Sequence, residues 1–392
     1  MTALIVENAR LVLEEGVFEG GVVVADGRIA HLTIGEAHSV IVVGDHVVIN
    51  LGGRYLAPGL IDIHVHGGGG HNLMTDDIDE VRAYARWAPS SGVTAFLVST
   101  SGRDHAQIVQ RLEALAPAVG AEPGAARVLG FHLEGPYINP IRKGAFDPRW
   151  LRPPDAGEYR ELSRASGGAV RQMTLAPELP GAGALIEAVV DSGATAAIGH
   201  TDATYAQAMR AIELGASHAT HTFNAMRPFG HRDPGVLGAV LGSDAVTAEL
   251  IGDGAHVDYA AARVLVRAKG ACNVVLVTDG MPLAGTPDGE AMWGDVAIRV
   301  EGGKAVRVSD GTIIGGVTTL DHMVRNAVEH LGVPLHEAVA MASTNAARAL
   351  RLEGRYGALR PGHAADFVLL DDALRVVETW VGGERVWVST PP

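Results

Sequence analysis

The chain has 392 residues, 47% of them apolar and only 5% aromatic, which is enough for one large, mainly aliphatic domain and a smaller unit. Its formal charge of −14 argues against nucleic acid and anionic membranes as partners, although a single pocket can still be basic. No run of about 18 apolar residues predicts a membrane span.

Cellular location is indicated by two further features. The N-terminus lacks the basic and apolar segments of a signal peptide. The single cysteine, Cys272, excludes an internal disulfide, and its apolar surroundings predict a buried, inert thiol. We therefore expect a cytoplasmic protein.

The chain begins with short strands, which we expect over residues 4–13, 20–32 and 39–51, separated by Gly, Asp and Asn. From Leu56 onward, apolar strands alternate with amphipathic helical stretches at about 106–116, 184–193, 205–215 and 260–270. The predicted strands lie near residues 60–65, 94–100, 127–135, 170–178, 195–201, 217–224, 246–254 and 272–280. Eight strands in this alternation predict an α/β protein built on a (β/α)8 TIM-type barrel.

After the eighth strand we expect a hairpin-like insert at 294–316, helical segments near 320–332 and 335–350, and strands at 362–371 and 375–388. Strands at both ends of the chain suggest that the termini combine into one small β-sandwich domain. The predicted domains are therefore residues 1–55 plus 359–392 for the β-domain and 56–358 for the barrel.

Metal-competent side chains stand at the predicted carboxyl ends of the strands, where a barrel of this kind forms its active site. His64 and His66 are two apart on one strand and so point to the same face. A bare H-x-H pair is as readily two ordinary loop histidines. Four more such residues follow other strands: Glu134, His200, His221 and Asp279. Together the six predict a site for one or two divalent metals, which zinc suits and iron, cobalt or manganese also fit.

Hydrolysis at such a site needs a proton carrier, and Asp279 is the candidate general base and acid. The alternative is that Asp279 only caps the following turn. None of the three lysines, Lys143, Lys269 and Lys304, lies on the fourth strand to bridge two metals, so Glu134 is expected to be the bridging or central ligand. The sequence also lacks a G-x-S-x-G elbow and a P-loop, which weakens serine-hydrolase and nucleotide-dependent hypotheses.

Six motifs in this order resemble the N-acetylglucosamine-6-phosphate deacetylase family of the amidohydrolase superfamily. They are PGLIDIHVHG (58–67), HLEGPYINPIRKGAFDP (132–148), GHTDATY (199–205), HTFNAMRPFGHRDPG (221–235), GDGAHVD (252–258) and LVTDGMPLAG (276–285). The resemblance implies removal of acetate from N-acetyl-D-glucosamine 6-phosphate, giving D-glucosamine 6-phosphate. It further implies that Glu134, His200 and His221 hold the principal metal, that His64 and His66 make a second site plausible, and that Asp279 is the catalytic acid and base.

The same resemblance implies the substrate contacts. Asn224 and Ala225 line the phosphate end and His256 contacts the sugar. Ala145, Ile314 and Gly315 complete the expected substrate-binding set. Arg232 matches an arginine that reaches the phosphate from the neighbouring subunit, which implies a homodimer; without the resemblance it would be an exposed arginine after a turn.

Two positions depart from the family pattern. Phe146 stands where the family usually has a substrate-contacting histidine, and phenylalanine cannot hydrogen-bond. Gly316 stands where a serine is common. The alternative substrate is therefore a different acetamido sugar, such as N-acetylgalactosamine 6-phosphate or an unphosphorylated sugar. A catalytically silent binding protein is the alternative from another class, but all six metal-competent positions are filled.

Overall fold

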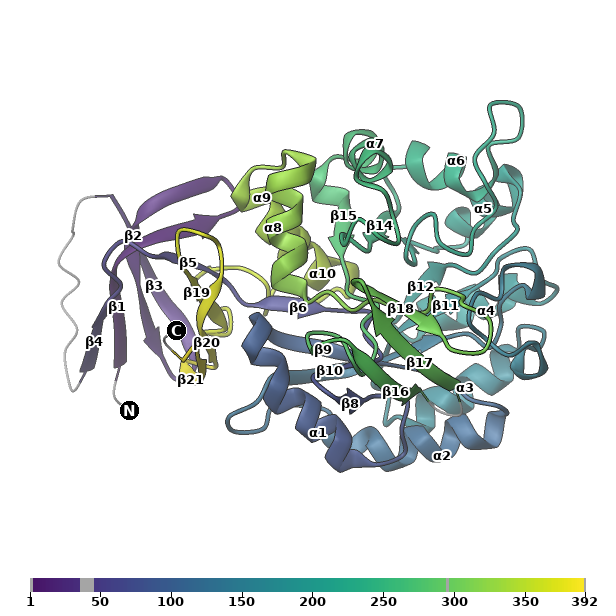
Figure 1. The fold of residues 1–392 in the computed structure, drawn as a ribbon, viewed down its shortest axis with the longest axis horizontal. Helices are drawn as coiled ribbons and strands as arrows, with labels where there is room; N and C mark the ends of the chain where they lie inside the picture. Colours follow the sequence, from purple (N-terminus) through teal and green to yellow (C-terminus); the bar gives the residue numbers. More distant parts are fainter. Residues whose placement is uncertain (1–2, 36–45, 294–295, 391–392) are drawn as a thin grey trace.

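The computed structural model describes residues 3–35, 46–293 and 296–390. Figure 1 shows a barrel flanked on one side by a separate sheet in which the beginning and the end of the chain lie together. Part of the predicted third strand, residues 39–45, lies outside the described residues.

The barrel sheet contains eight strands, and each pairs in parallel with its neighbour in chain order. They are β6 (Leu60–Asp62), β9 (Val93–Thr100), β10 (Arg127–Glu134), β11 (Val170–Leu175), β12 (Thr195–Ile198), β13 (His218–Ala219), β14 (Thr247–Leu250) and β15 (Val274–Leu276). A parallel bridge between Val65 and Gly280 links the continuations of β6 and β15. The predicted barrel is confirmed, and its strands are apolar because both sheet faces are covered.

Helices surround this sheet (Figure 1). They are α1 (Ile78–Trp87), α2 (His105–Leu115), α3 (Ala156–Ala165), α4 (Ala182–Asp191), α5 (Tyr205–Glu213), α6 (Gly235–Gly242), α7 (Tyr259–Lys269), α8 (Leu320–Leu331), α9 (Leu335–Met341) and α10 (Thr344–Ala349). Short 3-10 turns occur at η1 (Ala88–Ser91), η2 (Ala116–Ala118), η3 (Pro140–Arg142), η4 (Pro148–Trp150) and η5 (Ala271–Asn273). Side-chain caps fix several helix starts; Thr204 and Gln207 form a reciprocal capping box on α5.

Strands from both termini form the second sheet, as predicted. Its path runs β21 (Glu384–Val388), β20 (Val376–Val381), β19 (Phe367–Leu370), β5 (Tyr55–Pro58), β1 (Ala3–Leu13), β2 (Gly16–Ala25) and β3 (Arg28–Ile34), with β4 (His46–Asn50) paired to β1. Its own apolar core includes Leu11, Leu56 and the stacked rings of Phe367 and Trp380. The domain boundaries at residues 55 and 359 stay a prediction.

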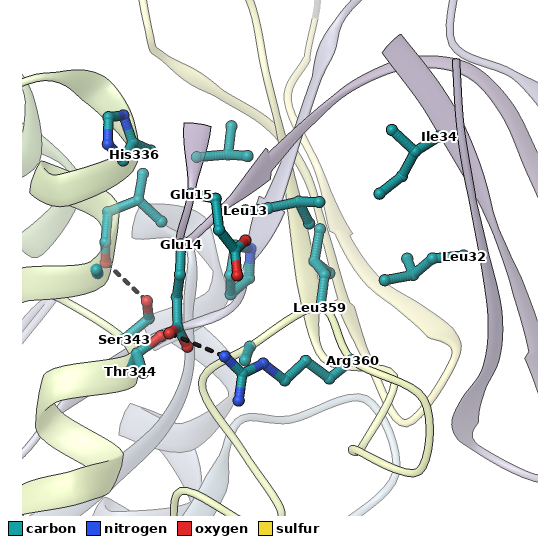
Figure 2. Close-up of a pocket in the computed structure, with 15 residues that line it drawn as sticks. Leu13, Glu14, Glu15, Leu32, Ile34, His336, Ser343, Thr344, Leu359 and Arg360 are labelled. Atoms are coloured by element: carbon teal, nitrogen blue, oxygen red, sulfur yellow. Dashed lines mark hydrogen bonds and ion pairs between the residues drawn. The ribbon is translucent and has the colours of Figure 1, made fainter. Parts of the chain in front are cut away.

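A mainly apolar hollow of about 210 Å³ lies where this sheet meets the barrel (Figure 2). Leu13, Leu32 and Ile34 come from the terminal sheet, while α9 contributes His336. An ion pair of 2.9 Å between Arg360 and Glu14 crosses it. The hollow is thus part of the junction between the two units.

The insert after the eighth strand forms more than a hairpin. It is a three-stranded antiparallel sheet of β16 (Gly289–Trp293), β17 (Val296–Glu301) and β18 (Lys304–Arg307). A smaller pair, β7 (Gly67–Gly68) and β8 (His71–Asn72), follows β6. The predicted insert, 294–316, began too late because β16 starts with Gly289, Glu290 and Ala291, residue types that are uncommon in strands. This sheet has its own apolar cluster, in which Trp293 and Met281 pack together.

Cys272 is exposed, so the prediction of a buried thiol was wrong. The residue belongs to the turn η5, and the strand begins only at Val274. Among the described residues, no helix combines the length and apolarity that crossing a bilayer requires.

Candidate active site

The six metal-competent residues predicted from the strand ends come together at the carboxyl end of the barrel. They form two groups, Glu134 with His200 and His221, and His64 with His66 and Asp279. Within each group the ligand atoms lie within 4.8 Å of one another. All are buried except Asp279, whose side chain is 14% exposed.

The first group converges tightly. Glu134 Oε1 lies 3.1 Å from Nε2 of both His200 and His221, and the two Nε2 atoms are 2.9 Å apart. His200 Nδ1 donates to the Arg142 carbonyl at 2.8 Å, which leaves an unprotonated Nε2 facing the group. Ligands about 2.0–2.1 Å from a tetrahedral cation lie roughly 3.3 Å apart. The donor set and its spacing therefore fit a bound divalent metal.

Glu134 also connects this group to the second one. Its Oε2 lies 3.1 Å from His66 Nε2, and its Oε1 lies 3.5 Å from His64 Nε2. Asp279 Oδ1 lies 3.4 and 3.5 Å from the same two nitrogens. His64 Nε2 is completely buried and has no hydrogen-bond partner among the described residues. An orphaned buried nitrogen among carboxylates fits a second cation.

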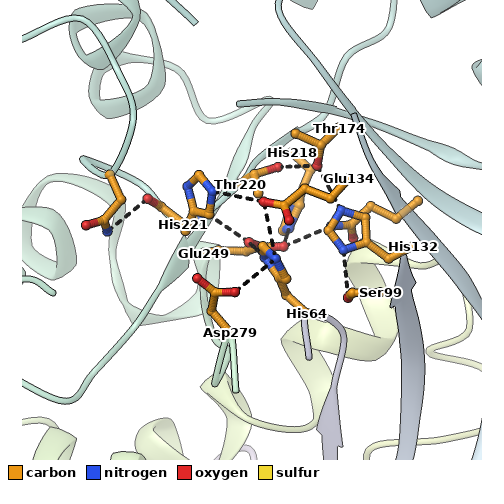
Figure 3. A network of polar contacts seen from close by, with 12 residues as sticks. His64, Ser99, His132, Glu134, Thr174, His218, Thr220, His221, Glu249 and Asp279 are labelled. Atoms are coloured by element: carbon orange, nitrogen blue, oxygen red, sulfur yellow. Dashed lines mark hydrogen bonds and ion pairs between the residues drawn. The ribbon is translucent and has the colours of Figure 1, made fainter. Parts of the chain in front are cut away.

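Glu249, on β14, is a site residue that the sequence analysis missed. Its carboxylate is fully buried and accepts from four groups, as Figure 3 shows in part. The donors are His64 Nδ1 (2.9 Å), the His221 backbone N–H (2.8 Å), His218 Nε2 (2.9 Å) and Gln172 Nε2 (2.9 Å). Burial alone would raise the pKa of Glu249, but its electrostatic interaction with His64 and the hydrogen bonds from His218 and His64 hold this pKa well below its usual range.

This carboxylate also sets the tautomer of His64. Because Nδ1–H donates to Glu249, the Nε2 lone pair is directed toward Glu134 and Asp279. The signal available in the sequence was a charged residue inside the apolar run VTAELI, since an unpaired buried charge is too costly to persist.

A second buried network lies beneath the site (Figure 3). His132 on β10 contacts Ser99 Oγ at 3.0 Å and Thr174 Oγ1 at 2.8 Å, and Thr174 in turn contacts Thr220 Oγ1 at 2.7 Å. Burial lowers the pKa of His132 well below its usual value, so the ring is neutral. The network ties several strands together under the metal-competent residues.

The backbone is strained at the residues that form the site. His200, His221, Ala225 and Asp279 have φ values of 48°, 29°, 51° and 44°, in the region that non-glycine residues rarely occupy. Each such residue costs on the order of 1–3 kcal/mol, which the surrounding packing must supply. His200, His221 and Asp279 follow β12, β13 and β15, so the strained turns lie where the chain leaves the sheet.

The lack of space around residue 316 explains why it is a glycine. A Cβ there would lie 2.2 Å from the Thr278 carbonyl oxygen, and the Gly316 N–H donates to the Asp279 carbonyl at 2.6 Å. The serine common in the resembling family therefore does not fit this backbone.

A hollow of about 220 Å³ opens above the two groups. Of the predicted substrate residues, Ala145, Asn224, Ala225, His256, Ile314 and Gly315 line it. Arg232 does not; it is exposed on the loop before α6. The hollow also includes residues that the sequence analysis did not propose as contacts, namely Gly144, Ala255, Met281, Trp293 and Ile313.

Two lining side chains have defined environments. His256 Nδ1 contacts Asp253 Oδ2 at 2.7 Å; burial lowers the pKa of His256, but this carboxylate raises it by more, so the net shift is upward. Phe146 is buried and packs edge-on against the His200 ring, with centroids 5.2 Å apart. The position that holds a histidine in the resembling family is therefore an apolar wall here.

Comparison with known proteins agrees with this geometry. The model of the amidohydrolase family matches residues 55–386. N-acetylglucosamine-6-phosphate deacetylase of Bacillus subtilis is 33% identical over 99% of this chain and 98% of its own. N-acetylgalactosamine-6-phosphate deacetylase of Escherichia coli O157:H7 is 36% identical over 84% and 87%, respectively. The solved structure of a Mycobacterium smegmatis N-acetyl-D-glucosamine-6-phosphate deacetylase mutant, in complex with N-acetyl-D-glucosamine-6-phosphate, has a TM-score of 0.91 at 35% identity, covering 98% of this chain and 100% of that one.

The buried contacts of Glu249 generate a stability prediction. Glu249→Gln places an amide where four donors require an acceptor, so we expect the free energy of unfolding to fall by at least about 3 kcal/mol. Urea denaturation followed by circular dichroism measures this. The exposed Glu301→Gln is the matched control and should change stability by less than about 0.5 kcal/mol. Equal stability of the two variants would contradict the importance assigned to Glu249.

Proposed function

We propose that this chain, which belongs to the amidohydrolase family, removes acetate from N-acetyl-D-glucosamine 6-phosphate and releases D-glucosamine 6-phosphate. One observation carries the proposal: six metal-competent side chains from five strand ends meet below a hollow that is also lined by Asn224, Ala225 and His256. The enzyme would act in amino-sugar metabolism. A cytoplasmic location stays a prediction.

The residues present fit one or two divalent cations. Glu134, His200 and His221 would hold the principal cation, and His64 and His66 a second one shared with Glu134. Zinc suits this set of imidazoles and carboxylates, and iron, cobalt or manganese also fit. A cation held there would polarise the acetamide carbonyl and lower the pKa of water.

Asp279 is proposed to move the proton. Its carboxylate is partly exposed in the hollow and faces His64 and His66. As water oxygen bonds to the acetamide carbon, Asp279 takes the water proton, and it returns this proton to the nitrogen as the C–N bond breaks. Acetate and the free amine leave. The turn-capping alternative is weakened because the Gly280 N–H donates to Thr278 Oγ1 instead (3.0 Å).

The remaining lining residues would orient the sugar phosphate. Asn224 and Ala225 would meet the phosphate, and His256, kept in place by Asp253, would contact the sugar. Ala145, Ile314 and Gly315 would enclose the ring. Phe146 offers no hydrogen bond, which together with the E. coli relative supports N-acetylgalactosamine 6-phosphate as the second candidate substrate.

A homodimer is proposed, with Arg232 reaching the phosphate in the neighbouring subunit. In the single chain Arg232 lies on the surface and outside the hollow, so its guanidinium is available to another copy. Large apolar side chains nearby are exposed: Ile141 by 72%, Phe229 by 57% and Tyr205 by 45%. Asp202 forms ion pairs with Arg142 and Arg227, and these pairs hold together the three segments on which the exposed apolar side chains lie. These side chains would be covered in a dimer.

The activity is tested by measuring acetate release from both 6-phosphorylated epimers and from unphosphorylated N-acetylglucosamine. We expect the highest kcat/KM with N-acetyl-D-glucosamine 6-phosphate, loss of turnover after exhaustive chelation, and recovery when Zn²⁺ is restored. Full activity of the metal-free protein would refute the metal-dependent mechanism. Equal rates with and without the phosphate would refute the phosphate contacts.

Asp279→Asn tests the proton carrier. The amide keeps the shape of the side chain but cannot accept the proton, so kcat should fall by a factor on the order of 10² or more. Bound metal, measured by mass spectrometry, should stay within the range of the unaltered protein. Asp310→Asn is the control: it makes the same replacement of a carboxylate by an amide at a half-exposed position and should leave kcat unchanged. Near-normal turnover of Asp279→Asn would contradict its role.

The trans role of Arg232 is tested by subunit complementation. Arg232→Gln alone should raise KM for the phosphorylated substrate by about tenfold or more, because a charged hydrogen bond is lost. Mixing it with Asp279→Asn subunits should restore activity, since each mixed dimer then has one site with both Asp279 and a neighbour's Arg232. An Arg232 that acts within its own subunit would give no restoration on mixing.

A further inference from the structure

Trp293, the last residue of β16, forms part of the wall of two hollows. One is the hollow of about 220 Å³ above the metal-competent groups. The other, which we call the second hollow, has a volume of about 620 Å³, and its further lining includes Met74 and Trp150. Ala145 and Phe146 complete the wall that the two hollows share. None of the proposed steps of acetate removal uses the second hollow.

The side chain of Trp293 is held firmly in this wall. The residue is 7% exposed and belongs to the apolar cluster of the insert, together with Met281, Ile298 and Ile314. Its backbone pairs with that of Val296 in the antiparallel ladder of β16 and β17. In a close-packed cluster a large ring has little room to change its rotamer. The indole is therefore a fixed boundary of the hollow above the metal-competent groups.

This boundary acts through its shape. Trp293 Nε1 is buried and has no acceptor among the described residues, so a smaller apolar side chain at this position would break no hydrogen bond. Two of the charged residues that line the second hollow are paired with carboxylates, Arg149 with Asp147 and Arg307 with Asp310. What the ring presents to the hollow above the metal-competent groups is therefore an apolar surface.

Trp293 lies on the side of the site that faces the acyl group. Its ring is 5.8 Å from the ring of His66, which follows β6. Asn224 and Ala225, proposed for the phosphate end, follow β13. Around the barrel β6 lies three positions from β13, past β14 and β15, and four is the largest separation that eight strands allow. When the amide lies at the metal-competent groups and the sugar phosphate extends toward Asn224, the acyl group points toward Trp293.

We propose that Trp293 determines the length of the acyl group that the enzyme removes. This inference rests on the proposed function of the same site. The indole leaves room for the methyl group of the acetyl unit and excludes longer chains, because a packed wall does not yield to added methylene groups without cost. Without the indole, the two hollows would join and a longer chain would enter the second one.

The chemical step would be the same for a longer chain. Water oxygen bonds to the acyl carbon, the C–N bond breaks and the nitrogen receives the proton. Propanoate or butanoate then leaves in place of acetate. A change at position 293 therefore alters which acyl group fits and leaves the bonds that form and break unaltered.

The experiment compares N-acetyl-, N-propanoyl- and N-butanoyl-glucosamine 6-phosphate by the release of glucosamine 6-phosphate. In the unaltered protein we expect kcat/KM to be lower than for the N-acetyl compound by about tenfold or more for N-propanoyl and about a hundredfold or more for N-butanoyl, because one methylene group is worth at least about tenfold in a fitted pocket. Equal values for the three compounds would overturn the inference and leave the proposed function intact.

Trp293→Ala should raise the ratio of kcat/KM for N-butanoyl to that for N-acetyl by at least about tenfold. Trp150→Ala is the matched control, because it removes the same side chain from the second hollow at a position outside the shared wall. Its ratio should stay within about twofold of that of the unaltered protein. A general loss of stability lowers the rates for all three compounds together and leaves the ratio unchanged. An equal rise in both variants contradicts a specific role of Trp293.

Trp293→Phe keeps an aromatic ring in the apolar cluster and replaces the alanine variant in the test if that variant does not fold. Its smaller ring should raise the ratio of N-propanoyl to N-acetyl by at least about threefold. Circular dichroism and bound metal show whether each variant is folded. An unaltered ratio in folded Trp293→Ala, or otherwise in folded Trp293→Phe, overturns the inference alone. Failure of all three compounds with the metal-loaded, unaltered protein overturns the inference and the proposed function together.

Discussion

The candidate active site depends on one buried carboxylate. Glu249 accepts hydrogen bonds from His64 and from the backbone of His221, which belong to the two different metal-competent groups. Removing a carboxylate from water is costly, and in the closed barrel that cost is offset only when every oxygen is fully hydrogen-bonded. The need to satisfy Glu249 therefore constrains the position of both groups at once, before any ligand is considered.

The backbone supplies the second constraint. Parallel strands place their carboxyl ends at one rim, and at several of these ends the chain turns sharply as it leaves the sheet. The positive φ values of His200, His221 and Asp279 provide this turn. The strain is tolerated because the strands below are buried and joined by the His132 and Thr174 contacts. Rigid strands and strained ends together form a preorganised site.

The sequence predicts the barrel and the six converging side chains because these depend on local signals. Apolar strands that alternate with amphipathic helices, and His, Glu or Asp at strand ends, are visible in a window of a few residues. Glu249 was not recognised because its importance comes from partners that follow β6 and lie on β11 and β13, which only the closed sheet brings near. Trp293 was missed for a similar reason: its contact with His66 depends on how a three-stranded insert folds over the barrel mouth. Cys272 was predicted to be buried because the strand was started two residues early.

The net charge of the chain and the charges beside the candidate site act over different distances. A net charge of −14 repels anions at a distance, yet screening limits that repulsion to roughly 8 Å at physiological ionic strength. Within that distance of a bound substrate, the charges that matter are those around the hollows, and beside the larger one Arg149 is paired with Asp147 and Arg307 with Asp310. Phe146 and Trp293 line both hollows and place apolar surface between these ion pairs and the metal-competent groups. The apolar residue at position 146 therefore does more than remove a hydrogen bond, because it also forms part of the wall that the two hollows share.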